Sequence, residues 1–259
     1  MTAAEAGFDG GLWPGYSRAS MQFSPSFLRF PESAVGRTVI DRVIRYFDAR
    51  MVGHEHVPRE GGALVVLNHG LFGFDAFVLG ALLWQHTRRH AVWLADGQLW
   101  KTPGLAATLD WVGAIPGTRE EAVERLRAGN LVVVYPGGIF DSYKLWRDRH
   151  RLKWHGRAGF ARVALRASVP IVPVAACGVD DMYRVVAREP GLGKLLFGDE
   201  RYNFPIALGR FGTPLPRPAR VTMHAFQPVL PSGPPDDEAE VERVRRLVHD
   251  AIQAKLDET

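Results

Sequence analysis

The stretch Ala63-Leu-Val-Val-Leu-Asn-His-Gly-Leu-Phe-Gly-Phe-Asp75 is the most informative part of the chain. Five consecutive apolar residues that end at a polar pair and a glycine-containing turn are typical of a strand buried on both faces. The pattern after the turn predicts a helix over Asp75–Trp84. A buried strand, a turn and a helix in this order form the first half of a parallel βαβ unit.

Short apolar runs alternate with helical patterns along the rest of the chain. We expect further strands at Ala91–Ala95, Leu131–Tyr135, Ile171–Ala176 and Val221–Phe226, and further helices at Glu120–Arg127, Arg157–Ser168 and Asp237–Leu256. This alternation predicts an α/β fold with a mostly parallel central sheet flanked by helices. Such sheets bind ligands beyond the carboxyl ends of their strands. The Gly- and Pro-rich stretch Pro190–Pro218 receives no assignment.

The N-terminal part has a different pattern. Residues 1–24 are rich in Gly, Ala and Ser and are expected to be flexible. Pro25–Met51 is predicted to be a basic amphipathic helix, because apolar residues recur every three to four positions with arginines between them. The helix either packs on the core or docks on anionic lipid. We therefore divide the chain into residues 1–52, a flexible segment with an amphipathic helix, and residues 53–259, an α/β domain that includes the C-terminal helix.

Composition narrows the function classes. With 46% hydrophobic and 23% charged residues among 259, long disorder and collagen-like structure are excluded. The single cysteine, Cys177, excludes an intrachain disulfide and a Cys-cluster zinc site, and we expect neither a metal nor a cofactor. The longest apolar stretches are far shorter than the roughly 20 residues of a membrane span. A cytoplasmic protein that is peripheral on the membrane fits these features.

The formal net charge is +4, and 27 of the 32 basic residues are arginines. Guanidinium groups suit phosphate and carboxylate oxygens. The charge fits anionic lipid surfaces, phosphorylated substrates and nucleic acid alike. Since no nucleic-acid-binding motif accompanies it, we expect no nucleic acid partner.

His69 and Asp75 flank the turn that follows the first buried strand. A carboxylate beside a histidine fixes the tautomer of the ring and stabilises the imidazolium, so the pair can take a proton from a hydroxyl. Alternatively, the histidine caps the turn and Asp75 is the N-cap of the next helix. Spacing alone leaves both interpretations open.

Three later segments accompany this pair: Gly113-Ala-Ile-Pro-Gly-Thr-Arg119, Tyr135-Pro-Gly-Gly138 and Val169-Pro-Ile-Val-Pro-Val174. In this order, the four segments resemble the four sequence blocks of the glycerolipid acyltransferase family, which includes lysophosphatidic acid acyltransferases. The resemblance covers about residues 55–178. It implies transfer of a fatty acyl group from a thioester to a lipid hydroxyl, and residues 53–259 are then the acyltransferase domain.

The resemblance also implies roles for single residues. His69 is similar to the family's general base, Asp75 to the carboxylate that orients it, and Arg119 to the arginine that binds the acceptor. Glycines in the third block let backbone N–H groups approach an oxyanion or phosphate. The residues expected to bind substrate are Asn68, Arg119, Tyr135, Pro136, Gly137 and Gly138.

Two departures from the family pattern bear on the acceptor. Five residues separate His69 from Asp75, where the family has four. The third block of phosphate-acceptor enzymes reads Phe-Pro-Glu-Gly-Thr-Arg, whereas Gly137 and Phe140 occupy the glutamate and arginine positions here. Tyr-Pro-Gly-Gly is similar to the diacylglycerol acyltransferase branch, whose acceptors are neutral. Asp141, just after this block, is either a further polar group of the site or, as we expect, a solvated loop residue.

The implied substrates are an acyl thioester, either acyl-CoA or acyl carrier protein, and a lipid acceptor, either a lysophospholipid or a glyceride, at a membrane surface. The basic stretch Arg147–Arg157 is a cradle for donor phosphates or for the acidic face of the carrier protein, a contact with anionic lipid, or a solvated loop. The aromatic side chains near His69 line an acyl tunnel or belong to the core: Phe72, Phe74, Phe77 and Trp84. Two alternative functions are acylation of a non-glycerol lipid, such as an amino-lipid or glycolipid, and lipid binding without catalysis.

Overall fold

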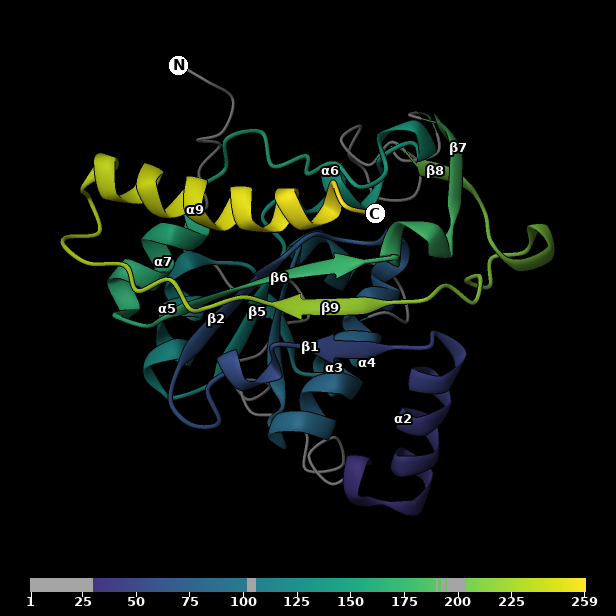
Figure 1. The fold of residues 1–259 in the computed structure, drawn as a ribbon, viewed down its shortest axis with the longest axis horizontal. Coiled ribbons are helices and arrows are strands. Elements are labelled where there is room, and N and C mark those ends of the chain that lie inside the picture. Colours follow the sequence, from purple (N-terminus) through teal and green to yellow (C-terminus); the bar gives the residue numbers. More distant parts are fainter. Residues whose placement is uncertain (1–29, 102–105, 190, 192–193, 195–203) are drawn as a thin grey trace.

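The computed structural model describes residues 30–101, 106–189, 191, 194 and 204–259. Its centre is a seven-stranded sheet with the order β1-β9-β6-β2-β5-β3-β4 (Figure 1). The strands are β1 Arg50–Val52, β2 Ala63–Leu67, β3 Ala91–Ala95, β4 Ala114–Pro116, β5 Leu131–Val134, β6 Ile171–Cys177 and β9 Thr222–Ala225. All neighbouring strands in this sheet pair in parallel except β6 and β9. The expected mostly parallel sheet is confirmed.

Helices cover both faces of the sheet, which explains the continuous apolar run of β2. The first face carries α3 Phe74–Thr87, and the opposite face carries α5 Arg119–Arg127, α7 Gly159–Ala167 and α9 Glu238–Leu256 (Figure 1). All five residues of β2 are buried. Val65 and Leu67 pack on the α3 side, whereas Leu64 and Val66 pack on the side of α7 and α9. A polar side chain at any position of β2 would be buried against an apolar layer, so every position of this strand requires an apolar residue.

The C-terminal helix α9 follows the sequence prediction closely. Its N-cap Asp237 accepts hydrogen bonds from the backbone N–H groups of Ala239 and Glu240. The apolar residues that α9 buries recur at helical spacing and are Val241, Val244, Val248, Ile252 and Leu256. This apolar stripe anchors α9 across one face of the sheet.

The N-terminal helix is shorter than predicted. The described part begins with a 3-10 turn, η2 Phe30–Glu32, and α2 spans Ala34–Tyr46 rather than Pro25–Met51. The predicted helix is wrong at its C-terminal end because Arg50–Val52 forms β1, which hydrogen-bonds to β9 and buries Met51. Sheet pairing therefore overrides helix continuation there. Residues 1–29, including the segment expected to be flexible, lie outside the described residues, and the division of the chain at residue 52 stays a prediction.

A second sheet combines one strand just before the unassigned stretch Pro190–Pro218 with one strand inside it. β7 Arg184–Glu189 and β8 Phe204–Leu208 pair antiparallel and stand apart from the central sheet (Figure 1). The short helical segments elsewhere are η3 His54–His56, η4 Leu71–Gly73, η5 Gly97–Lys101, α4 Ala106–Trp111, α6 Ile139–Ser142, η6 Trp146–Asp148, η7 Val179–Met182 and η8 Arg210–Gly212. Within the described residues, no helix combines the length and apolar character needed to cross a bilayer.

Candidate active site

His69 lies just beyond the carboxyl end of β2, where a parallel sheet of this kind binds its ligands. Asn68 before it is fully buried, and its side-chain amide both donates to the carbonyl of Ala176 and accepts from the backbone N–H of Ala176 in β6. These two bonds tie the end of β2 to its neighbouring strand. The Asn68 amide therefore has a structural role inside the fold, and its contact with substrate stays a prediction.

The side chains of His69 and Asp75 are in contact despite the five residues between them. His69 Nδ1 lies 3.0 Å from Asp75 Oδ2, the Asp75 side chain is completely buried, and that of His69 is 20% exposed. The extra residue is accommodated by two successive left-handed residues, Phe72 with φ 58° and Gly73 with φ 73°. Gly73, and not Asp75, is the N-cap of α3, so the alternative of Asp75 as a helix cap is wrong.

The contact fixes which nitrogen of His69 is able to accept a proton. Since an ionised carboxylate only accepts hydrogen bonds, the proton sits on Nδ1 and points at Asp75. Nε2 then carries the lone pair, and it has no hydrogen-bond partner among the described residues. A hydroxyl placed against Nε2 would meet a base whose tautomer is held by its neighbour.

Tyr135, at the end of β5, stacks on the His69 ring with 3.9 Å between the ring centroids. Burial raises the pKa of the Tyr135 phenol well above its ordinary value, and the Asp75 carboxylate raises it further. The phenol therefore stays protonated at neutral pH. Its hydroxyl and Asp75 Oδ1 are both buried without a hydrogen-bond partner in the described part of the chain. The stacked Tyr135 ring restricts the movement of the His69 ring on one face.

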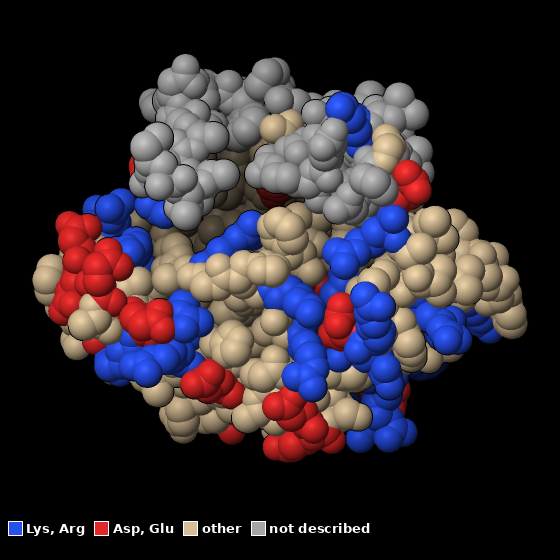
Figure 2. Space-filling model, turned by 90° about the horizontal axis from the view of Figure 1, so that it is seen from above, with Lys and Arg blue, Asp and Glu red and all other residues tan. Residues whose placement is uncertain are grey.

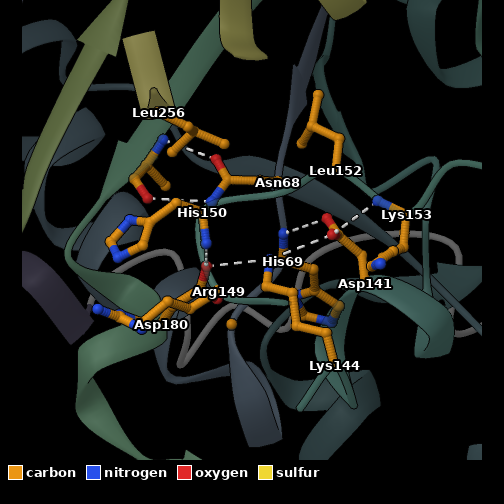
Figure 3. Close-up of polar contacts among 12 residues, drawn as sticks. Asn68, His69, Asp141, Lys144, Arg149, His150, Leu152, Lys153, Asp180 and Leu256 are labelled. Carbon is orange, nitrogen blue, oxygen red and sulfur yellow. Dashed lines mark hydrogen bonds and ion pairs between the residues drawn. The ribbon is translucent and has the colours of Figure 1, made fainter. Parts of the chain in front are cut away.

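Asp141 is the largest correction to the sequence analysis, because it is not a solvated loop residue. Its side chain is completely buried and accepts a hydrogen bond of 2.9 Å from the backbone N–H of His69 (Figure 3). The same carboxylate accepts from the backbone N–H of Lys153 at 3.2 Å and from Lys144 Nζ at 3.2 Å. Next to it, Ser142 Oγ donates to the carbonyl of Gly70. Asp141 and Ser142 therefore hold the backbone on both sides of the histidine side chain.

Lys144 bridges two buried carboxylates, Asp141 and Asp180, at 3.2 Å and 3.0 Å. Burial alone would lower the pKa of the Lys144 amine, but the carboxylates of Asp180 and Asp141 outweigh burial and raise it. Sequence reasoning missed Lys144 and Asp180. The sequence offers no signal for this contact, because the two residues lie far apart in the chain and only the fold brings them together.

The basic stretch Arg147–Arg157 is pinned to the core through its backbone. Asp180 accepts from the backbone N–H of His150, and Asp141 accepts from that of Lys153 (Figure 3). Gln253 of α9 bonds to the stretch as well. The loop is therefore held at the site by the same carboxylates that contact Lys144.

A large, mostly apolar cavity of about 1580 Å³ opens at His69. Side chains of α2, α3, β3, α4 and the start of α5 line it. Phe72, Phe77 and Trp84 are among its lining residues, as the acyl-tunnel interpretation expects, whereas Phe74 packs into the core near Tyr183. The volume exceeds the roughly 300–1,000 Å³ that is usual for drug-sized ligands.

The amphipathic helix α2 forms one wall of this cavity. Val39, Ile40 and Val43 line it, while Gly36 is the sole buried residue of α2. The apolar side of α2 therefore lines an open cavity, and it is neither fully buried in the core nor fully exposed to solvent. Contact of α2 with lipid stays a prediction.

The remaining predicted substrate-binding residues divide into two groups. Arg119, the first residue of α5, is exposed, lines the cavity and has no hydrogen-bond or ion-pair partner among the described residues. Gly138 also lines the cavity, and its N–H donates to the carbonyl of Tyr135. Pro136 and Gly137 are buried behind this lining.

Gly137 is required by packing, which gives a testable prediction. A Cβ at Gly137 would lie 2.4 Å from the Cβ of Asp141. We expect Gly137→Ala to lower the free energy of unfolding by about 1–3 kcal/mol, because the added methyl group pushes Asp141 away from the His69 backbone. Chemical denaturation measures the effect. Gly117→Ala is the matched control, since its Cβ would meet no atom closer than 3.4 Å; equal stability of the two variants would contradict the prediction.

The chain is similar to several known proteins. The sequence model of the acyltransferase family matches residues 48–176. A relative from Bos taurus, named "DGAT1/2-independent enzyme synthesizing storage lipids", is 31% identical over 205 residues, which are 79% of this chain and 58% of the relative. The uncharacterized protein Rv0502 of Mycobacterium tuberculosis is 29% identical over 268 residues, covering 100% of this chain and 73% of that protein.

The fold also has a match among solved structures. The 1-acyl-sn-glycerophosphate (LPA) acyltransferase PlsC from Thermotoga maritima superimposes with a TM-score of 0.52 and 17% identity, covering 86% of this chain and 80% of that one. This likeness concerns the fold. The chain spans about three fifths of the length of the mammalian relatives it matches. The four blocks lie in order within the matched residues 48–176, so this part of the chain belongs to the acyltransferase family.

Proposed function

We propose that the protein moves a fatty acyl group from acyl-CoA or acyl carrier protein to a hydroxyl of a lipid acceptor, with His69 as the general base. The observation that carries this proposal is the His69–Asp75 pair at the mouth of a large apolar cavity. The pair supplies a base of defined tautomer, and the cavity supplies room for an acyl chain. Family membership supports the reaction class.

The reaction needs no nucleophilic side chain, because a thioester is already activated. The acceptor hydroxyl gives its proton to His69 Nε2 as its oxygen attacks the thioester carbonyl. The Asp75 carboxylate stabilises the imidazolium that forms. When the tetrahedral intermediate collapses, the C–S bond breaks and the leaving thiolate takes the proton from Nε2. We expect backbone donors near the third-block turn to face the oxyanion, other than the N–H of Gly138, which donates to Tyr135.

The acceptor is a lysophospholipid or a glyceride. Arg119 at the cavity favours an anionic headgroup, because guanidinium binds phosphate by two parallel hydrogen bonds. Phe140 at the family's third-block arginine position favours a neutral acceptor. Arg157 partly replaces the missing charge, since its guanidinium lies 5.0 Å from the centre of the Phe140 ring and Arg157 also lines the cavity.

Product analysis tests the proposal directly. Purified protein is incubated with labelled acyl-CoA, or with acyl carrier protein, and a panel of lysophosphatidic acid, other lysophospholipids, monoacylglycerol, diacylglycerol, an amino-lipid and a glycolipid. We expect mass spectrometry to find an acylated glycerolipid whose formation needs the thioester. If only the amino-lipid or the glycolipid gives a product, the acceptor is a non-glycerol lipid. Binding of acyl-CoA without any product would favour the lipid-binding alternative, which the intact His69–Asp75 contact opposes.

Substitution of Arg119 separates the two acceptor classes. Because hydrogen bonds to charged groups contribute about 1.5–3 kcal/mol, Arg119→Ala is expected to raise KM for lysophosphatidic acid about 10- to 100-fold and to leave KM for diacylglycerol within about twofold. Initial rates over a range of acceptor concentrations measure both. Arg127→Ala on the same helix is the control, since Arg127 does not line the cavity. Equal effects of Arg119→Ala on both acceptors would remove Arg119 from the headgroup site.

The acceptor and the acyl chain are both membrane-derived in this proposal. We therefore place the protein on the cytoplasmic surface of a membrane, as a peripheral protein. The exposed arginines and the apolar wall formed by α2 support this placement.

A further inference from the structure

The second sheet and the loop that follows it expose an unusual amount of apolar surface. Phe211 in the loop is 88% exposed and Leu215 is 64% exposed. Three further aliphatic side chains of the hairpin are 41–49% exposed, namely Val186, Ile206 and Leu208. In Figure 1 this loop, in light green after β8, projects from the right-hand side of the molecule. We name these five residues the hairpin patch. Several large apolar side chains exposed on one supersecondary unit point to an interaction site.

Short backbone hydrogen bonds close the loop that carries Phe211 and Leu215. The backbone N–H of Arg210 donates to the carbonyl of Leu215 at 2.7 Å, and that of Gly209 donates to the carbonyl of Thr213 at 3.0 Å. Gly209 has to be glycine, because a Cβ there would lie 2.0 Å from the Leu215 carbonyl oxygen. The closed turn holds Phe211 outward with a left-handed φ of 54°, a conformation that bulky residues rarely adopt. Phe211 therefore lies at the tip of a closed turn, and its side chain is 88% exposed.

Among the described residues near the hairpin patch in sequence, most charged side chains are positive. Between residues 183 and 218, the described cationic residues are Arg184, Arg188, Lys194, Arg210 and Arg217, and Glu189 is the one described acidic residue. The Arg210 guanidinium lies 4.9 Å from the centre of the Phe211 ring, so charge and aromatic surface are adjacent. Figure 2 shows uncharged surface bordered by Lys and Arg at the right-hand end of the molecule. Apolar side chains surrounded by arginines match the acyl boundary and the anionic headgroups of a lipid leaflet.

Residues beside the hairpin patch contact the cavity, although the five patch residues do not line it. Tyr183, just before β7, packs edge-on against Phe72 with 5.4 Å between ring centroids, and Phe72 lines the cavity. At the other strand, Phe204 at the start of β8 lines the cavity as well. A bilayer in contact with the hairpin patch would therefore lie near the opening through which a lipid reaches His69.

We propose that the hairpin patch docks the protein on anionic phospholipid bilayers, with Phe211 and Leu215 inserted among the acyl chains and the arginines on the headgroup phosphates. The catalytic benefit of this docking rests on the proposed function, but binding itself is measured without an acyl donor. A second copy of the chain is the competing occupant of the apolar surface. The cationic border opposes it, because two such patches would repel each other.

Vesicle co-sedimentation tests the apolar part of the proposal. The full chain is mixed with vesicles of phosphatidylcholine, or of phosphatidylcholine with phosphatidylglycerol, in the absence of acyl thioester. We expect strong binding only to the anionic vesicles, and we expect Phe211→Ser combined with Leu215→Ser to weaken it at least tenfold. Leu230→Ser is the matched control, since Leu230 is 71% exposed but lies outside the hairpin patch. Unchanged binding by the double variant would overturn the proposal.

Arginine substitutions test the electrostatic part. Each of Arg184→Gln and Arg210→Gln is expected to weaken binding to anionic vesicles about fivefold, with a loss that shrinks as salt rises. Arg246→Gln on α9 is the matched exposed control and is expected to bind as the unmodified chain does. Equal losses for Arg246 and Arg210 would show a general charge effect and overturn the assignment of the surface.

Two readouts separate this inference from its alternatives. Acyl transfer to a detergent-dispersed acceptor is expected to be unchanged in the Phe211 and Leu215 variant, whereas transfer to a vesicle-borne acceptor falls with binding. Absence of transfer in every format, with intact vesicle binding, would refute the proposed function and leave the docking surface standing. Light scattering that shows a dimer converted to a monomer by the double variant would assign the patch to self-association instead.

Discussion

His69→Ala is expected to lower kcat/KM for acyl transfer by about 10²–10⁴-fold while the protein stays folded. Among the described residues at the cavity mouth, the imidazole is held in place for taking a proton, because Asp75 contacts Nδ1 and Tyr135 stacks on the ring. Removing it also leaves a buried carboxylate without its partner, so we expect a stability loss of about 1–3 kcal/mol. That loss is smaller than the usual stability of a domain.

The measurement combines initial rates with circular dichroism and a denaturation curve on the same preparation. His86→Ala is the control, since His86 stacks on His54 and does not line the cavity. We expect the control to keep full activity. Turnover retained in a folded His69→Ala protein would remove the mechanism, whatever the acceptor.

Lys144→Met is expected to destabilise the protein by about 3–5 kcal/mol, the largest stability effect that we predict for a single side chain. The substitution leaves the carboxylates of Asp141 and Asp180 buried without their cation. Asp141 also contacts the backbone of His69, so we expect kcat to fall in the fraction that remains folded. Urea denaturation and initial rates on the same sample give both quantities.

Lys153→Met is the matched control for this prediction. Lys153 is one-third exposed, and its ammonium group lies 3.6 Å from Asp148, so its ion pair is screened by solvent. We expect a change within about 1 kcal/mol. Similar losses for Lys144→Met and Lys153→Met would mean that the buried carboxylates do not depend on Lys144.

The stabilising effect of Lys144 has a defined pH range. The pKa of its amine is raised in the folded protein, so its contribution is complete below the unfolded-state pKa of about 10.4. The contribution is lost only as pH rises through the folded-state pKa. The stability difference between the unmodified chain and Lys144→Gln is therefore expected to stay constant from pH 6 to about pH 9 with respect to this group, and to shrink in stronger alkali.

Long buried elements were predictable from the sequence, and short or pairing-dependent ones were not. The run in β2 is apolar at every position, and α9 repeats its apolar residues over several turns, so each pattern is unambiguous. β1 and β4 have three residues each, too few to show a period. β1 forms because it pairs with β9, a strand that lies about 170 residues away in the sequence. β8 lies in Gly- and Pro-rich sequence, where propensity opposes strands, and β7, just before that stretch, is only six residues long.

The candidate site also contains some residues that the sequence predicts and others that only the fold reveals. His69, Asp75 and Arg119 were predictable, because each occupies a fixed position in one of the ordered sequence blocks. Asp141 was placed in solvent because a loop aspartate is exposed by default, and only the fold shows that it lies beneath His69. Its partnership with Lys144 and Asp180 depends on three separate segments meeting, which no local pattern encodes.

The two left-handed residues between His69 and Asp75 have a consequence for recognising relatives. A search that demands a fixed number of letters between histidine and aspartate passes over chains in which one more residue is looped out. In this chain the backbone reversal at Phe72 and Gly73 brings the two side chains to 3.0 Å, so the distance between them, and not the number of residues, defines the pair.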